Sequence, residues 1–168
     1  MKVAGNVWKF PQDDINTDQI RSKIYAHLPA GEQAKHCFEG IDPQFAARAK
    51  PGDILVVGRN FGCGSSTLTH GALMALGIAA IVAESFGRLF FRSSVSDGLP
   101  VAACPGVTEA VSAEDRIEVD TVHGYVKNLA TGTTLSCEPL PAILNEILEY
   151  GGEKPYLKAR IAREAQAR

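Results

Sequence analysis

The stretch "GDILVVGRNFGCGSSTLTHGALMALGIAAIVAE", residues 52–84, decides the fold. Its apolar, β-branched run at 52–58 follows Pro51 and predicts a buried strand. A loop of glycines and serines comes next, followed by an expected helix over 68–77 and a second apolar strand over 78–84. A strand, a helix and a strand in this order indicate parallel strands joined by a crossover helix.

The same alternation continues on both sides of this stretch. Residues 2–10 predict a first strand, 85–98 a helix and 99–104 a further strand. Beyond Pro105 the pattern changes to short β segments and then an amphipathic helix, expected at 116–120, 123–129, 133–139 and 140–152. The sequence therefore predicts an α/β fold in β/β/α layers, with a parallel α/β core and a small β meander. We expect one domain over 1–168, with a helical tail from about 153.

The segment between the first two strands is less regular. Residues 31–40 and 42–50 favour two short helices. In the second of these, Asp42 is expected as the N-cap and Pro43 at the first helical position, because proline lacks the amide that an N-terminal helical residue leaves unpaired.

Composition limits the functions open to the chain. Its 168 residues are 45% hydrophobic and 21% charged, with a formal net charge of −2, which favours a globular protein and no nucleic-acid partner. The polar start and the lack of a long apolar run predict neither a signal peptide nor a membrane span. Four widely spaced cysteines match no zinc or C-x-x-C pattern, so reduced thiols in a cytoplasmic protein are expected.

The loop "GRNFGCGSSTLTHG", residues 58–71, admits several interpretations. It lacks the lysine of a phosphate-binding P-loop, and its glycines do not form the dinucleotide fingerprint. Cys63 with His70 as base would make a thiol nucleophile, although a small buried cysteine is favoured. A loop that leads to Ser65 and Ser66 at a helix N-terminus is typical of an anion-binding nest, but a plain helix cap explains it equally well.

Three motifs together carry a family resemblance: "DDINTDQI" at 13–20, "FGCGSS" at 61–66 and "AESFGRLFFRSSVSDGLP" at 83–100. In this order the chain resembles the swivelling domain of the aconitase superfamily, as found in 3-isopropylmalate dehydratase small subunits. The motifs cover residues 3–100, and the length agrees over the whole chain.

This resemblance implies a hydro-lyase that moves a hydroxyl between adjacent carbons of a small hydroxy-dicarboxylate, as in leucine biosynthesis. It implies a [4Fe-4S] cluster carried by an aconitase-like large subunit, in a heterodimer or heterotetramer, with no metal on this chain. The alternatives are a related hydro-lyase, homoaconitase-like or methylmalate-type, and a non-catalytic anion-binding module.

The resemblance also implies roles for individual residues. Ser65 corresponds to the serine base, and Ser66, beside Gly64, to a hydrogen-bond donor for a substrate carboxylate. Asp18 corresponds to an aspartate that assists proton transfer, although an Asx turn is its structural alternative. The stretch 18–29 falls at the specificity loop of the family, which adds Arg21, Lys23 and His27 as substrate-binding candidates.

One position departs from the family pattern. Thr67 stands where the family has an arginine, so a planar charged donor is missing, and its loss costs about 2–5 kcal/mol in a dry site. Either Arg21, Lys23, Arg59 or a large-subunit residue takes over, or the substrate differs. His70 restores a charge near the helix start or lies on the helix surface.

The segment 83–100 also has a structural interpretation. Phe86, Leu89 and Phe90 recur at helical spacing and are expected to pack a helix on the sheet. Arg88 and Arg92 are expected at the surface or at a subunit interface.

Overall fold

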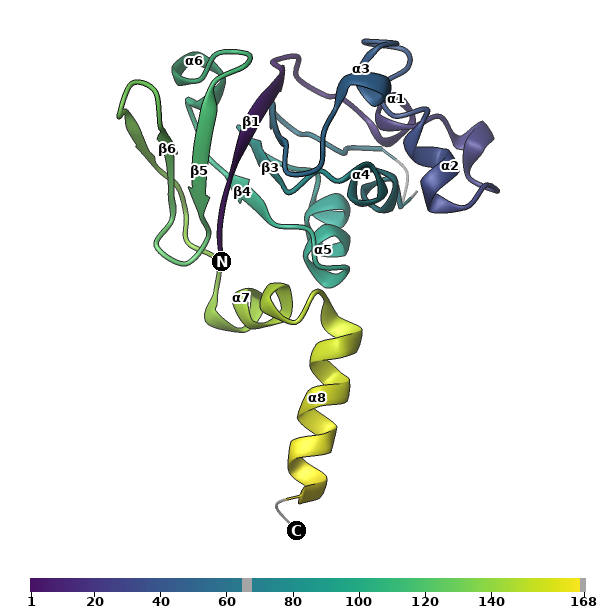
Figure 1. The fold of residues 1–168 in the computed structure, drawn as a ribbon, viewed down its shortest axis with the longest axis vertical. Helices are drawn as coiled ribbons and strands as arrows, with labels where there is room; N and C mark the ends of the chain where they lie inside the picture. Colours follow the sequence, from purple (N-terminus) through teal and green to yellow (C-terminus); the bar gives the residue numbers. More distant parts are fainter. Residues whose placement is uncertain (65–67, 167–168) are drawn as a thin grey trace.

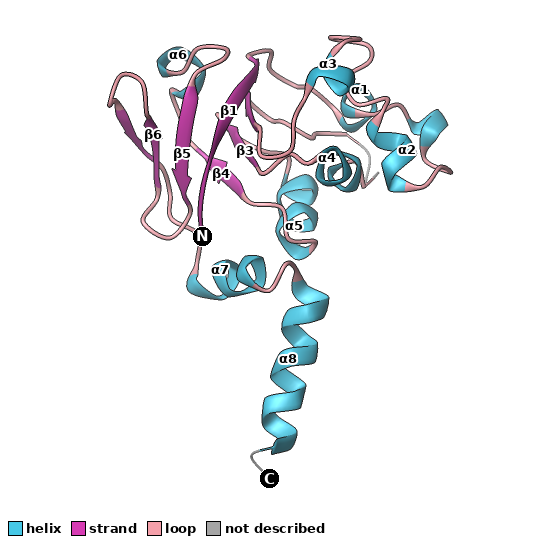
Figure 2. Ribbon diagram, viewed as in Figure 1, coloured by secondary structure: helices cyan, strands magenta, loops and turns pink. Residues whose placement is uncertain are grey.

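The computed structural model describes residues 1–64 and 68–166, which form a mixed α/β fold. In Figure 2 the strands gather on one side of the molecule and helices α1–α5 on the other. The strands are β1 (Lys2–Phe10), β2 (Ile54–Val57), β3 (Ala80–Ala83), β4 (Val101–Ala103), β5 (Arg116–Asp120), β6 (Tyr125–Asn128) and β7 (Thr134–Ser136). The helices are α1 (Thr17–Ile20), η1 (Lys23–Tyr25), α2 (Ala30–Ala34), α3 (Phe45–Arg48), α4 (His70–Leu76), α5 (Arg88–Ser96), α6 (Val107–Ala110), α7 (Ala142–Glu149) and α8 (Glu153–Gln166).

Strand β1 joins the two halves of the sheet, whose order is β4-β3-β2-β1-β5-β6-β7. Its second half runs parallel to β2, with Val7 opposite Ile54, and its first half runs antiparallel to β5, with Val3 opposite Val119. The parallel core and the antiparallel meander predicted from the sequence are therefore confirmed as parts of one sheet.

The two faces of the sheet bury different apolar clusters. Along β2, Leu55 and Val57 pack in the cluster with helices α4 and α5, while Ile54 and Val56 pack with the meander and α6. Every residue of β2 is fully buried, as expected for a strand covered on both faces.

The sheet curls until its outer strands approach one another. Cys104, just after β4, and Cys137, just after β7, belong to one buried cluster although their strands are the two edges of the sheet. A hydrogen bond between the two thiols raises the pKa of Cys104 and lowers that of Cys137. The cluster with Ile54 and Val56 is thus enclosed by the curled sheet itself.

Several predicted helix bounds are wrong. The helix expected over 31–40 is α2 at Ala30–Ala34, and the helix expected over 85–98 is α5 at Arg88–Ser96. Two further helices begin later than predicted. Helix α4 begins at His70, with Thr69 as its N-cap, so Ser65 and Ser66 are not at its N-terminus. Thr69 is β-branched and would lose rotamer freedom inside the helix, which favours a start after it. The C-terminal end is as predicted, because Gly77 caps it in the left-handed conformation at φ 93°.

Helix α3 also begins later than predicted, at Phe45 with Gln44 as N-cap. Asp42 is not the N-cap, and Pro43 is not the first helical residue. The Asp42 carboxylate instead accepts the backbone N–H of Gln44 at 3.0 Å, because the chain makes one turn before it becomes helical.

The interpretation of α5 needs one correction. Phe90 is buried and Phe86 packs partly against the core, as expected, but Leu89 is 58% exposed. Adjacent residues on a helix point about 100° apart, so Leu89 and Phe90 cannot both face the sheet. Arg88 and Arg92 are exposed.

Helix α7 packs on the core through the buried Leu148, whereas α8 leaves the body of the molecule. Figure 1 shows α7 beneath the sheet and α8 extending away from it. The rings of Tyr150 and Tyr156 meet edge to face at 5.7 Å, and Arg163 donates to the Tyr150 hydroxyl. Helix α8 covers Glu153–Gln166, and none of these residues is buried. Among the described residues, no helix combines the length and apolarity needed to cross a membrane.

Candidate active site

The loop 58–64 lies at the edge where the parallel strands end, held between two neighbouring loops. On one side, Gly62 donates its N–H to the Ile15 carbonyl at 2.8 Å, and Thr17 donates to the Cys63 carbonyl at 3.0 Å. On the other side, Phe61 donates to the Ser85 carbonyl at 3.0 Å. In an open α/β sheet, ligands bind outside the carboxyl ends of the strands, so this loop occupies the position of a binding site.

Two glycines of the loop are required by close approach and by backbone conformation. Gly62 has φ 74°, and a Cβ added there would lie 2.2 Å from Cγ of Phe90. Gly64 has φ 98° and lies against Asn16 and Thr17, with a Cβ position 3.5 Å from Asn16 Cβ. A side chain is strained at both positions, and at Gly62 it also clashes with the core.

Helix α1 brings Asp18 beside this loop. A capping box fixes the helix, because the Asn16 side chain accepts the Gln19 N–H and the Gln19 side chain accepts the Asn16 N–H, both at 3.0 Å. Asp18 is exposed, and its Oδ1 accepts the backbone N–H of Lys23 at 2.8 Å. Asp18 and Gly64 therefore lie at the same edge of the sheet, because Thr17, next to Asp18, bonds Cys63, next to Gly64.

Arg21 is the unexpected member of the predicted set, because its side chain is buried at 2% exposure. Its Nη1 donates to the Ser22 carbonyl at 3.0 Å, whereas its Nε has no partner among the described residues. Burial lowers the pKa of Arg21, opposed by the nearby Cys37 and Asp18. Burial also raises the pKa of the Cys37 thiol to about 12. An enclosed guanidinium with an unpaired donor is a favourable place for an anion.

The remaining members lie on the stretch after α1. Lys23 and His27 are both exposed, and neither side chain has a hydrogen bond or ion pair with the described residues. Tyr25, between them, stacks on His36 with ring centroids 3.6 Å apart. Ser65, Ser66 and Thr67 lie outside the described residues.

The thiol interpretation of the loop finds no base in this geometry. Cys63 is partly exposed, its Sγ lies 3.5 Å from the Asp14 carbonyl, and burial and Asp14 together raise its pKa. His70 is not on the helix surface as predicted. It is 1% exposed, and its Nε2 lies 2.7 Å from Asp97 Oδ2, because the late start of α4 turns this residue toward α5.

A polar cleft of about 340 Å³ opens beside the loop 58–64, at the edge of the sheet where the parallel strands end. The Glu84 carboxylate there accepts N–H groups of Gly106 at 2.7 Å and Thr108 at 2.9 Å, and the Thr108 hydroxyl at 2.7 Å. Burial opposes ionisation of Glu84, but these bonds and Arg59 lower its pKa overall. The arrangement fixes the loop after β4 and places Arg59 in the cleft wall.

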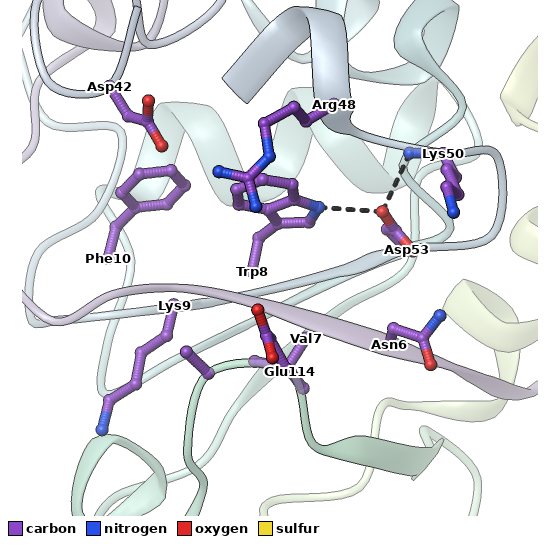
Figure 3. A pocket seen from close by; sticks show the side chains of 11 residues that line it. Asn6, Val7, Trp8, Lys9, Phe10, Asp42, Arg48, Lys50, Asp53 and Glu114 are labelled. Atoms are coloured by element: carbon purple, nitrogen blue, oxygen red, sulfur yellow. Dashed lines mark hydrogen bonds between the residues drawn. The ribbon is translucent and has the colours of Figure 1, made fainter. Parts of the chain in front are cut away.

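A pocket of about 450 Å³ lies beside β1 and contains none of the predicted site residues. Figure 3 shows the Arg48 guanidinium over the Trp8 ring, 5.2 Å from its centroid, and Asp53 beside them. The Asp53 carboxylate accepts the Trp8 indole N–H at 2.8 Å and the Lys50 N–H at 2.9 Å. These contacts fasten α3 and the turn before β2 to the first strand.

The described residues of this chain do not form an iron–sulfur site. Over residues 1–64 and 68–166, no three His, Cys, Asp or Glu side chains are grouped as metal ligands. Three of the four free thiols are buried in the core, at Cys37, Cys104 and Cys137.

The sheet and its loop define a class: an α/β protein whose glycine-rich loop and cationic side chains gather at the carboxyl ends of parallel strands. Within that class, the chain belongs to the aconitase C-terminal domain family, which matches residues 3–103. The family resemblance predicted from the three motifs is confirmed.

Relatives extend the likeness along almost the whole chain. The isopropylmalate/citramalate isomerase small subunit of Methanocaldococcus jannaschii is 43% identical over 163 residues, covering 95% of this chain and 96% of that protein. The 3-isopropylmalate dehydratase small subunit 1 of Methanopyrus kandleri is 46% identical and covers 89% of each chain. A crystal structure of 3-isopropylmalate dehydratase (leuD) from Methanocaldococcus jannaschii superposes with a TM-score of 0.92 at 34% identity, covering 100% of both chains.

Sequence reasoning missed the pairing of His70 with Asp97 and the anchoring of the loop after β4 by Glu84. Both interactions join residues more than 20 positions apart. The only sequence signal was the polarity of Glu84 at the end of an apolar segment, and Asp97 gave none.

Proposed function

We propose that this chain is the small subunit of an iron–sulfur hydro-lyase that dehydrates and rehydrates a hydroxy-dicarboxylate, with 3-isopropylmalate as the first candidate substrate. One observation carries the proposal: identity of 39–46% with proteins named as small subunits of such enzymes, over 89–96% of this chain. The glycine-rich loop at the carboxyl edge of the parallel strands supplies a place for the substrate.

In this proposal the chemistry is divided between two chains. An aconitase-like large subunit carries a [4Fe-4S] cluster, which acts as a Lewis acid on the departing hydroxyl. This chain supplies Ser65 as the base that removes the proton from the adjacent carbon, and Ser66 and Gly64 as donors to a carboxylate. Asp18 is exposed at the same edge and assists proton transfer.

A serine base requires nearby positive charge, because a free hydroxyl ionises only at high pH. Helix α4 cannot provide it, since it begins at His70. We assign this task to Arg21, whose Nε is buried without a partner among the described residues. The exposed Lys23 adds a second positive charge nearby in the sequence. A substrate carboxylate would pair with Arg21 in place of the arginine that Thr67 replaces.

The test is Ser65→Ala in the complex with the large subunit, with Ser136→Ala on exposed β7 as a matched control. Turnover should fall at least about 1,000-fold in the first variant and stay within twofold in the second. Subunit association, followed by size-exclusion chromatography, should be unchanged in both. Retained turnover in Ser65→Ala would remove Ser65 from the role of base.

Citramalate is a second candidate substrate, and two observations together favour it. Thr67 departs from the family pattern, and the Methanocaldococcus jannaschii relative is named for both isopropylmalate and citramalate. We therefore propose to assay the complex with 2- and 3-isopropylmalate, citramalate and homocitrate under identical conditions. Binding of all four without turnover would favour the non-catalytic anion-binding alternative.

A further inference from the structure

Residues 62–70 are called the Ser65 segment here, and helix α5 contacts both of its ends, at Gly62 and at His70. At one end, Gly62 packs directly on the ring of Phe90, which leaves no room for a side chain. At the other end, His70 lies edge to face against the same ring at 6.2 Å and reaches Asp97 just beyond the helix. The two described flanks of this segment thus rest on one rigid element.

The contact between His70 and Asp97 is the polar fastening at the second flank. The Nε2–Oδ2 distance is 2.7 Å, and because an ionised carboxylate only accepts, His70 donates this bond. His70 is 1% exposed, whereas the Asp97 side chain is 52% exposed. Thr69, the residue before, is fully buried, so the chain enters the core at this point.

Ser93 completes a Ser–His–Asp arrangement, since its Oγ lies 3.4 Å from His70 Nδ1. A nucleophilic serine is excluded here by the position of this hydroxyl. It lies in the middle of α5 and bonds the carbonyls of Leu89 at 2.9 Å and Phe90 at 3.1 Å, so its proton is held by the helix. The arrangement orients the imidazole and performs no chemistry of its own.

We propose that His70 and Asp97 are positioning residues that fix the carboxyl end of the Ser65 segment on α5. The inference rests on the proposed function, because it assigns importance to the place of Ser65. The first flank is fixed by backbone bonds from Gly62 and Thr17. At the second flank the Thr69 carbonyl accepts the N–H groups of Ala72 and Leu73 within α4, and the His70–Asp97 contact joins this helix start to α5. A shift of about 1 Å in a catalytic group lowers turnover by up to about 100-fold.

The experiment uses the complex of both subunits and four variants. Asp97→Ala removes the acceptor from an exposed position, and Asp97→Asn keeps an oxygen that accepts the same N–H. His70→Gln keeps a donor in the buried position. His123→Ala is the matched control, because His123 contacts Asp120 at 2.8 Å on the β5–β6 hairpin, in a different part of the sheet.

Two readouts separate positioning from general stability. We expect kcat of Asp97→Ala to fall about 10- to 100-fold with KM within threefold, while Asp97→Asn and His70→Gln recover at least a third of the wild-type kcat. In the free small subunit, amide hydrogen exchange in the peptide covering 62–71 should become at least about fivefold faster in Asp97→Ala alone. His123→Ala should change neither quantity.

Either of two results would overturn the inference. Unchanged exchange in Asp97→Ala shows that the contact does not fix this flank, and faster exchange with unchanged kcat shows that fixing it does not serve catalysis. The exchange readout does not depend on turnover. Failure of the proposed function would instead appear as retained activity in Ser65→Ala.

Discussion

Replacing Arg21 by methionine should stabilise the free subunit and weaken substrate binding in the complex. Methionine has an unbranched apolar chain of similar length, so it fills the space of the aliphatic part of arginine. Arg21 is 2% exposed, and among the described residues its Nε has no partner and its guanidinium makes one hydrogen bond, to the Ser22 carbonyl. Its removal therefore takes away a burial cost that the fold of this chain does not offset.

The magnitude follows from these contacts. An unpaired buried N–H costs about 1–3 kcal/mol, and replacement of buried charges by apolar groups stabilises proteins by a similar amount. We expect the free energy of unfolding to rise by about 1–3 kcal/mol, which raises Tm by about 2–9 °C for a chain of this length. In the complex, loss of a buried carboxylate contact, about 2–5 kcal/mol, lowers kcat/KM about 30- to 5,000-fold.

Thermal unfolding by circular dichroism measures the first effect, and steady-state kinetics of the reconstituted complex measures the second. Arg116, the exposed first residue of β5, gives the control Arg116→Met, which should shift the unfolding free energy by less than about 0.5 kcal/mol. A lower Tm combined with unchanged kcat/KM would refute the reasoning, since the guanidinium would then serve the fold and not an anion.

Two further predictions concern stability. Asp53→Ala removes the shared acceptor of Trp8 and Lys50, so the free energy of unfolding should fall by about 2–4 kcal/mol. Urea unfolding followed by fluorescence of the single tryptophan measures it, and an unchanged midpoint would contradict it. For Asp120, burial opposes ionisation, but bonds from His123 and Val122 lower the folded pKa from 3.8 to about 2. Its stabilisation is therefore present above about pH 4 and lost as the pH falls toward 2. Asp120→Asn should lower Tm by about 5–10 °C at pH 7 and by only about 1 °C at pH 2, and a constant difference would exclude this linkage.

The strands and most helices followed from hydrophobic patterns because burial on one or both faces leaves a period in the sequence. The run that became β2 is apolar throughout and is buried throughout. Helix starts were less predictable, since Asp42 can accept an N–H in a turn as readily as in a cap. Leu89 shows that an apolar residue at helical spacing need not face the core.

The candidate site was proposed from the glycines of residues 58–64, whose signal is local, and from Asp18, whose role the family resemblance implies. The burial of Arg21 and the pairing of His70 with Asp97 depend on which helices pack together. No local pattern contains that information. Sequence reasoning therefore named Arg21 for its charge, while its unpaired donor became visible only in three dimensions.

The central place of β1 has a consequence for how the chain folds. This strand is made first, yet its first half pairs with Arg116–Asp120 and its second half with Ile54–Val57. During synthesis β1 therefore stays partly unpaired until Asp120 has left the ribosome, because only then are both β2 and β5 present. Contacts between residues so distant in sequence slow folding. Until they form, the unpaired backbone of β1 can pair with other chains and promote aggregation. Refolding from denaturant should accordingly be slow and sensitive to protein concentration.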